Sequence, residues 1–470
     1  MSATQPRGAP ASRPLRAVAT WTPDSVPPDP LTRRKGFLSR LLRDDPRTRR
    51  RLSIVFAIVI LAFSVAPVVN HYQALPNKDY NLWYATGWFY YHGEPIYPTD
   101  NRPFPFMYPP TAAALLAIVS VLGEPLFVVA LLAANAAAWV GAVLLSVKLA
   151  TGAACRQKPL LYLLPTLMVV PFVHDMFLLG QPNLLLLTLL LGAFTALRAG
   201  REWPAGALIA LAVGIKAFPL LALPYLVYRR RWKAVAATGI VGAALLWGLP
   251  AVFRGPAGAW SDLKVWTQGM VLKYDEGQIA QRPERCYSFK NQSLVAVANR
   301  LLRDVPADGE SKDGWHVNVA HLGFQSVNAL VVCSALGLGL FYLASMSWRR
   351  PRDVAAESAE TAMLILLILI FSPFAFNYFY VWLIYPLTVL LARLLDGDPR
   401  QRRVLTVGLL VALDLYALSV VSLRGSQAYG NLLAVNLLLL GLLGWTLRRT
   451  RTENRGQELF PGARPPLIAS

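Results

Sequence analysis

The stretch Leu52–Val69, LSIVFAIVILAFSVAPVV, carries no charged residue and is long enough to cross a membrane as a helix. Similar apolar runs recur as far as Leu447, and they lack the alternation of apolar and polar residues that marks the strands of a membrane barrel. A hydrophobic share of 55% and a charged share of 15% leave too little polar surface for a soluble protein of 470 residues. The sequence therefore predicts an all-α polytopic membrane protein.

Composition divides the chain into three parts. Residues 1–51 are rich in Pro, Ser and Arg and lack an apolar run, which favours a basic, disordered cytoplasmic tail. No small-residue cleavage pattern follows Val69, so we expect an uncleaved first span and no signal peptide. Residues 52–447 are predicted to form the membrane domain and residues 448–470 a second cytoplasmic tail.

Lys and Arg clusters flank the apolar runs, where they set the orientation in the membrane, so the charge of +20 does not indicate a nucleic-acid partner. The basic loops, which we assign to the cytoplasm together with both tails, are 148–158, 198–201, 229–233, 349–352 and 393–403. The loops 70–109 and 254–322 then face outside. We expect about twelve crossings, in a bacterial inner membrane.

The stretch Ala205–Tyr228 lies between two basic clusters and is too short for two full spans. It predicts a broken hairpin that turns near Lys216, with Pro219 interrupting the helix. A buried lysine needs an anion, and a phosphate would satisfy it. The alternatives are that Lys216 reaches the membrane surface or pairs with a structural carboxylate. The short run 111–122 is predicted not to cross the membrane.

Five polar motifs fall on the predicted outer face. They are Asp79-Tyr80, Tyr108-Pro109-Pro110, Gly180-Gln181-Pro182-Asn183, Asn291-Gln292-Ser293-Leu294, and Ser372-Pro373 with Asn377-Tyr378. Polar loop residues gathered on one face of a rigid scaffold are where a site is expected. Gln181 and Asn183 can bond sugar hydroxyls, although their motif is equally compatible with a plain turn between helices.

Asp79 opens the stretch DYNLWYATGWFYYHG, which predicts an interfacial helix because its aromatic residues recur at helical spacing. The aromatic residues assigned to one face are Tyr80, Trp83, Tyr84, Trp88 and Tyr91. Such a helix would hold Asp79 where a lipid-borne substrate presents its headgroup. The alternative is that Asp79 only caps the helix.

Other ionisable residues give weaker signals. His174 and Asp175 are adjacent and would not face each other on a helix. Asp414 lies in the middle of a predicted span, where a hydrogen-bonded structural role is favoured. The scattered histidines and cysteines match no metal-binding spacing, so no metal site is expected.

The order of these motifs resembles glycosyltransferase family 87, the polyprenyl-phosphate-mannose-dependent α-mannosyltransferases with the GT-C fold. The resemblance spans Asp79 to Pro386 and includes a G-x-x-x-Y pattern from Gly93 to Tyr97. It implies a GT-C-like helix bundle with interfacial helices. It also implies inverting transfer of a sugar, with mannose expected, from a polyprenyl-phosphate donor to a lipid or glycan acceptor at the outer leaflet. No cofactor and no divalent metal are implied.

The resemblance also implies roles for individual residues. Asp79 is the expected general base, and Lys216 the cation at the leaving phosphate, with Arg282, Arg285 and Lys290 as alternatives. The expected substrate contacts are Tyr108, Gln181, Asn183, Asn291, Gln292, Asn377 and Tyr378. Family members often carry a His after the Ser-Pro pair, and this chain lacks it, so another sugar or acceptor stays open.

A transporter or lipid flippase is the main alternative, because carriers also combine broken helices with intramembrane residues such as Lys216 and Asp414. Many carriers repeat the broken helix in two halves, whereas this chain has one such hairpin and one large outer loop. That asymmetry favours an enzyme. A non-catalytic partner in envelope biosynthesis is the third possibility.

Overall fold

The computed structural model describes residues 41, 45–73, 79–100, 103–153, 158–282, 286–308, 314–346 and 352–459. Within these ranges the chain forms helices joined by loops, with one isolated β-bridge between Tyr274 and Ile279. Helix α2 (Pro46–Tyr72) begins inside the predicted first tail, and α18 (Asn431–Leu459) extends into the second. The rest of both predicted tails lies outside the described residues, apart from residues 41 and 45.

Eight helices of the described part are long and apolar enough to cross a membrane. They are α2, α5 (Glu124–Thr151), α6 (Leu160–Leu179), the run from α10 (Trp232–Ala243) through α11 (Leu249–Trp266), α13 (Phe324–Ser345), α14 (Val354–Phe371), η6 (Asn377–Leu383) with α15 (Ile384–Asp396), and α18. Shorter apolar helices, among them α7 (Asn183–Arg198), complete the bundle. The all-α polytopic architecture is confirmed, and the count of about twelve crossings stays a prediction.

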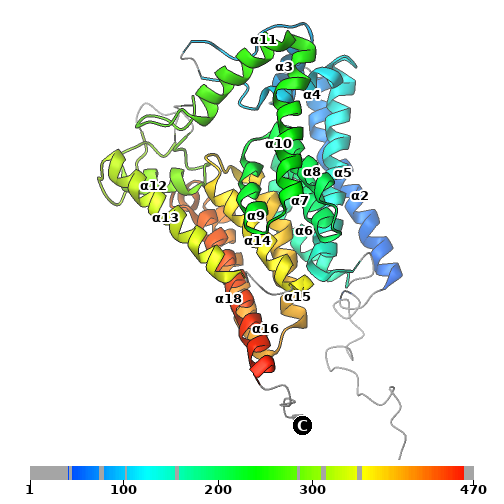
Figure 1. Ribbon diagram of the computed structural model, residues 1–470, viewed down its shortest axis with the longest axis vertical. Helices are drawn as coiled ribbons and strands as arrows, with labels where there is room; N and C mark the ends of the chain where they lie inside the picture. Colours follow the sequence, from blue (N-terminus) through cyan, green and yellow to red (C-terminus); the bar gives the residue numbers. More distant parts are fainter. Residues whose placement is uncertain are drawn as a thin grey trace, which may run out of the picture.

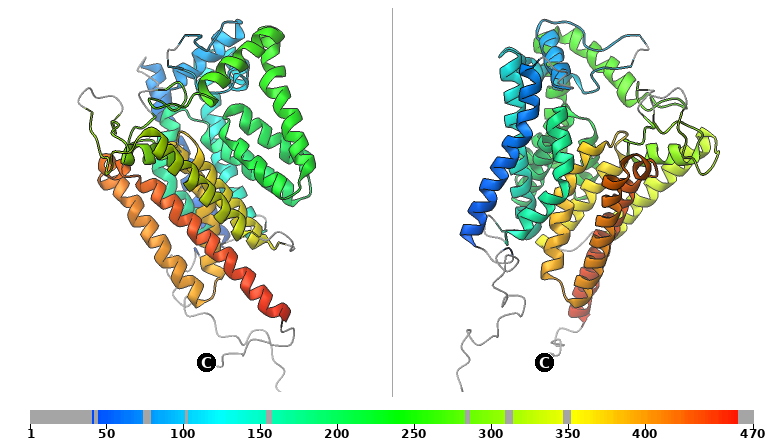
Figure 2. Two further views of the ribbon diagram at one scale, coloured as in Figure 1. Left: turned by 60° about the vertical axis from the view of Figure 1, so that its left-hand side comes forward. Right: turned by 180° about the vertical axis from the view of Figure 1, so that it is seen from behind.

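The centre of the bundle is formed by α14 and by η6 with α15. Their apolar windows are 72% and 78% buried, against 6% for α2 and 11% for α13, which therefore lie at the periphery. Helix α16 (Pro399–Val421) packs beside α18 along one edge (Figure 2). The start of α2 and the end of α18 lie at the same end of the bundle, which we call the basic end (Figure 1).

Ion pairs at the basic end fix α14 against its neighbours. Glu360 is 1% exposed; it accepts a hydrogen bond from Arg352 at 2.9 Å and forms an ion pair with Arg229 at 2.5 Å. One turn earlier, Glu357 accepts from Arg198 of α7 at 3.0 Å. A buried carboxylate with both oxygens paired is tolerated, so these arginines hold the central helix in position.

The predicted broken hairpin is confirmed. Helix α8 (Glu202–Ile215) ends immediately before Lys216, whose backbone is extended (φ −144°, ψ 135°). The chain returns through η3 (Phe218–Ala222), which contains Pro219, and through α9 (Leu223–Tyr228). Helix α4 (Pro110–Ser120) has 11 residues, too few to cross the membrane, which agrees with the prediction for this run.

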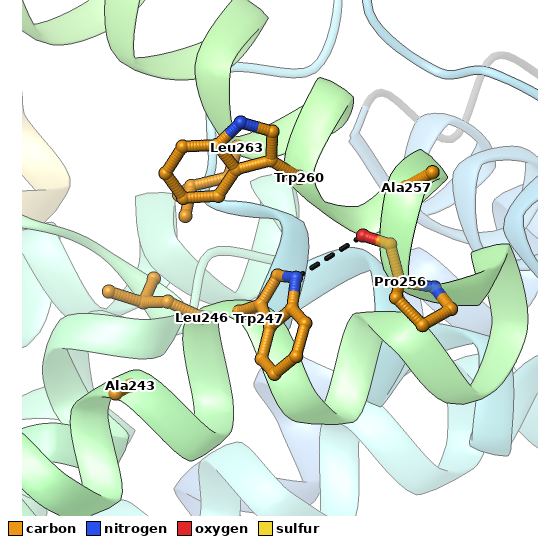
Figure 3. A pocket seen from close by; sticks show the side chains of 7 residues that line it. All are labelled: Ala243, Leu246, Trp247, Pro256, Ala257, Trp260 and Leu263. Carbon is orange, nitrogen blue, oxygen red and sulfur yellow. Dashed lines mark hydrogen bonds between the residues drawn. The ribbon is translucent and has the colours of Figure 1, made fainter.

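The run from α10 to α11 bends sharply at Gly255, where φ is +68°. This conformation is readily available only to glycine. Trp247 donates from its indole Nε1 to the Pro256 carbonyl at 3.2 Å across the bend, beside a groove that Trp260 also lines (Figure 3). Beyond the bend, α11 runs obliquely over the end of the bundle opposite the basic end (Figure 1). Exposed Trp rings prefer the headgroup level, so we infer a membrane boundary here.

Helix α3 (Asp79–Tyr91) forms where the sequence predicts it, at the same end as α11 (Figure 1). The assignment of its aromatic residues to one face is wrong. Tyr80 and Trp83 are buried against the bundle, whereas Trp88 and Tyr91 are 42% and 49% exposed. The buried rings have neighbours from distant segments, which helical spacing alone does not reveal.

Candidate active site

A cavity of about 400 Å³ lies between the start of α3, the end of α6 and the loops before α4, before α12 (Leu294–Leu302) and after α14. The predicted site residues that line it are Asp79, Tyr108, Gln181, Asn377 and Tyr378. Four of the predicted motifs, far apart in the sequence, therefore meet at one site. The NQSL motif supports this site from behind, as described below.

Asp79 is held by Gln181. The Gln181 Nε2 atom donates to Asp79 Oδ2 at 2.5 Å. On the other side of the same amide, Oε1 accepts from the Tyr108 hydroxyl at 2.8 Å and from Lys216 Nζ at 3.0 Å. Because two donors occupy the amide oxygen, the amide nitrogen must point to Asp79. This network leaves Asp79 Oδ1 without a protein donor, within the part of the chain that the structure describes.

Lys216 is 6% exposed and is not among the residues that line the cavity. Its ammonium donates to Gln181 Oε1 and, at 2.9 Å, to Asn183 Oδ1. It also lies 4.6 Å from the centre of the Phe379 ring and 4.9 Å from that of Tyr108. Amide oxygens and ring faces both stabilise a cation. Among the described residues no carboxylate forms an ion pair with Lys216, and hydrogen bonds through Gln181 connect Lys216 to Asp79.

The turn between α6 and α7 requires the glycine of its motif. Gly180 ends α6 with φ +76°, and a Cβ atom there would lie 3.0 Å from the ring of Tyr80. Tyr80 in turn donates its hydroxyl to the Phe177 carbonyl at 2.7 Å. The close packing of this ring on the glycine places the start of α3, and with it Asp79, beside Gln181.

Asn183 lies behind the cavity wall. Its Nδ2 donates to the Tyr378 carbonyl at 3.0 Å, and its own carbonyl accepts from Trp382 Nε1 at 2.8 Å. Asn183 therefore joins the start of α7 to η6 and is not among the residues that line the cavity.

Asn291 and Gln292 are fully buried and do not line the cavity. Asn291 Nδ2 donates to the carbonyls of Cys286 and Pro373, at 2.9 and 3.0 Å, and its Oδ1 accepts from the Ala375 amide at 2.9 Å. Gln292 donates to the Gln427 carbonyl at 2.6 Å. These amides hold the Ser-Pro segment in place, and their predicted contact with substrate has no counterpart in the cavity wall.

Arg300 supports the same region and was not singled out from the sequence. Its fully buried guanidinium donates to five carbonyl oxygens and, among the described residues, pairs with no acid. The accepting residues are Tyr287, Ser288, Asn291, Gln427 and Ala428. Burial lowers the pKa of this guanidinium to about 10. One cation thus ties the loop before α12 to α17 (Leu423–Ala428).

Two cations line the cavity, Arg282 and Lys290. Arg282 donates to the Phe104 carbonyl at 2.8 Å, and Lys290 is exposed. Arg285, the third alternative for the phosphate, lies outside the described residues. Burial raises the pKa of the Tyr108 phenol, and Tyr378 and Asp79 act in the same direction. Tyr108 therefore stays protonated and donates a hydrogen bond to Gln181.

The cavity holds two further carboxylates, Asp175 and Asp308. Asp175 lies 3.8 Å from His174, but His174 does not line the cavity. Asp308 follows no recognisable motif, so nothing in the sequence marked it. Asp414 is exposed on α16, away from the cavity. Among the described residues, no three metal-ligating side chains gather in one place.

Fold and cavity together define a multi-pass membrane protein with a carboxylate site at one end of its helix bundle. The profile of glycosyltransferase family 87 matches residues 106–373. The chain belongs to this family. Its match covers the Tyr108, Gln181 and Lys216 network and ends at Pro373.

Two curated relatives carry the name polyprenol-phosphate-mannose-dependent alpha-(1-2)-phosphatidylinositol pentamannoside mannosyltransferase. The protein from Mycobacterium tuberculosis (strain CDC 1551 / Oshkosh) is 29% identical over 322 residues, 67% of this chain and 64% of its own length. The protein from Mycolicibacterium smegmatis (strain ATCC 700084 / mc(2)155) is 34% identical over 145 residues, 30% of this chain and 34% of its own. The chain thus spans less than two thirds of either relative. No solved structure matches it.

Proposed function

We propose that this protein transfers a mannosyl residue from polyprenyl-phosphate-mannose to a hydroxyl of a lipid-linked glycan. Membership of glycosyltransferase family 87 and the donor printed in the names of both relatives support the reaction class. The observation that carries the proposal is the cavity, in which the Asp79 carboxylate shares one space with the cations Arg282 and Lys290.

Asp79 is the general base of the proposed reaction. As the acceptor oxygen attacks the anomeric carbon, its proton passes to Asp79 Oδ1, while Gln181 keeps Oδ2 occupied. The bond between the anomeric carbon and the phosphate oxygen breaks on the opposite side, and the electron pair leaves with the polyprenyl phosphate. At the anomeric carbon one C–O bond forms and one breaks with inversion, the acceptor's proton moves to Asp79, and no redox change occurs.

Arg282 and Lys290 stabilise the departing phosphate in this proposal, because both line the cavity and fixed positive charge there favours the developing negative charge. Lys216 has a different role in the proposed reaction. It lies behind the wall and orients Gln181, and through it Asp79. Neither role requires a metal ion from the protein.

We place the cavity on the outer face of the plasma membrane. Arg198, Arg229 and Arg352 pair with glutamates in the first two turns of α14. The basic end lies opposite α3 and α11 (Figure 1), and short loops rich in Lys and Arg stay in the cytoplasm. A lipid-borne donor would then meet Asp79 at the outer leaflet.

The test is transfer by the purified full-length protein. It is incubated with polyprenyl-phosphate-mannose and extracted envelope lipids that include phosphatidylinositol mannosides, the acceptor class named for the relatives. Mass spectrometry should find a lipid that has gained one hexose, in amounts that depend on added donor. A folded protein that binds the donor yet adds no sugar to any extracted lipid would contradict the proposal.

A further inference from the structure

Asp308 is the least expected charged residue in the cavity. Its side chain is 10% exposed, and its Oδ2 accepts from Arg424 Nη2 at 3.1 Å. Its other oxygen, Oδ1, is buried and has no hydrogen-bond partner among the described residues. A buried carboxylate oxygen without a donor is unfavourable, so this atom indicates a ligand that supplies one.

The position of Asp308 is fixed by the backbone hydrogen bonds of the preceding residue and by the contact of its side chain with Arg424. The preceding residue, Ala307, is fully buried; its amide donates to the Trp315 carbonyl at 2.7 Å, and its carbonyl accepts from the Phe289 amide at 2.5 Å. Arg424, at the start of α17, lies over the Trp315 ring, 5.0 Å from its centre. The carboxylate is therefore held at the cavity by its backbone and by one oxygen, which leaves the second for a ligand.

The chemistry of the vacant oxygen selects the ligand. A carboxylate accepts hydrogen bonds and donates none, so a phosphate would be repelled and a hydroxyl or amine attracted. Oδ1 is buried in this conformation, and because the terminal torsion of an Asp side chain is soft, rotation can turn this oxygen toward a group in the cavity. A sugar presents several hydroxyls to such a wall, and a polyprenyl chain presents none.

We propose that Asp308 is a sugar-binding and specificity-determining residue, whose Oδ1 accepts a hydrogen bond from a hydroxyl of the sugar in the cavity. The inference rests on the proposed function, which brings two sugars to this site, the donor mannose and the glycan acceptor. Both offer the same chemistry, and kinetic measurements with each substrate varied in turn distinguish them.

The experiment compares Asp308→Ala and Asp308→Asn with the wild type, using the full-length protein in detergent or nanodiscs. Asp304→Ala is the matched control: Asp304 belongs to the same loop, its side chain is 65% exposed, it pairs with His316, and it does not line the cavity. KM is measured for donor and acceptor separately, together with kcat and melting temperature.

We expect Asp308→Ala to raise KM for one of the two substrates by roughly 10- to 100-fold, as expected for a hydrogen bond to a charged group. Asp308→Asn should fall between wild type and Ala because it retains one acceptor oxygen, and Asp304→Ala should match the wild type. A donor or acceptor analogue that lacks the bonded hydroxyl should abolish the difference between wild type and Asp308→Ala.

Unchanged KM for both substrates in a correctly folded Asp308→Ala protein would overturn this inference alone, since the wild type would still transfer mannose. Loss of kcat in both Asp308 variants with KM preserved would also overturn it and indicate a role in proton transfer. If the wild type transfers no mannose, the proposed function fails first; unchanged binding of the mannosyl donor and of the acceptor lipid to Asp308→Ala would then overturn the inference separately.

Discussion

Gln181→Glu is the change that most sharply tests the network around Asp79. The substitution keeps the shape of the side chain and the oxygen that Tyr108 and Lys216 bind. It replaces the donor that contacts Asp79 Oδ2 at 2.5 Å with a second carboxylate oxygen. Lys216 gains a charged partner, so we expect the protein to fold with an unchanged or higher melting temperature.

The effect on transfer can be worked out from this geometry. The lost hydrogen bond to a carboxylate is worth about 1.5–3 kcal/mol, or roughly 10- to 100-fold in rate if it holds the base in its reactive position. Two unit charges about 4 Å apart repel by about 4 kcal/mol at an effective dielectric constant near 20, about three pH units. Below about pH 7 the pair therefore retains a proton, which removes the base. Raising the pH removes that proton, so part of the lost rate should return.

The assay is the initial rate of mannosyl transfer over a range of pH, with melting temperatures measured at each pH. Gln278→Glu is the matched control, since Gln278 donates to Asp275 at 3.4 Å outside the cavity. It should leave both rate and pH profile unchanged. A Gln181→Glu protein with the rate and pH profile of the wild type would refute the role of Gln181 in holding the base.

Three further predictions concern the surroundings of the network. Lys216→Met removes the donor to the buried Asn183 amide oxygen and leaves Gln181 Oε1 with Tyr108 alone, so it should lower unfolding stability by about 1–3 kcal/mol and reduce kcat more than donor affinity; a purely donor-binding defect would contradict this. Gly180→Ala should destabilise the protein and impair transfer, because φ is +76° and a Cβ would lie 3.0 Å from the ring of Tyr80; wild-type melting and transfer rate would refute it. Burial raises the pKa of the Cys286 thiol, so an impermeant maleimide should label it only after denaturation, whereas Lys273→Cys, in the same loop, should be labelled in intact spheroplasts; protection there would contradict the outer location.

Most of the fold could be predicted because membrane helices are encoded locally. Apolar runs of sufficient length give the spans, and the Lys216 hairpin follows from a stretch too short for two of them. Helix ends were less certain: α2 begins at Pro46, since arginines fit a helix as well as a tail. The prediction for the aromatic residues of α3 was wrong for another reason. Periodicity gives the face on which Trp83 or Trp88 lies, but not which face meets the bundle.

The sequence predicted which residues belong to the candidate site better than it predicted how they are arranged. The order of the motifs along the chain placed Asp79 and Gln181 in one predicted site, because each lies in a short motif next to a helix end. It did not reveal that Asn291 binds backbone carbonyls or that Lys216 lies behind the wall, since those contacts join residues far apart in the sequence. Asp308 could not be predicted for the same reason: its side chain pairs with Arg424, 116 residues away.

Asp79→Asn tests the central claim most directly, with transfer rate and melting temperature measured for wild type, Asn and Ala in the same detergent. An amide matches a carboxylate in size and caps a helix about as well, but it cannot accept the acceptor's proton. We predict that the Asn variant folds and binds donor like the wild type, while its rate falls by roughly 10² to 10⁴, the usual loss when a positioned general base is removed. Near wild-type turnover in Asp79→Asn, with only a lower melting temperature in Asp79→Ala, would show that Asp79 caps α3 and is not the base.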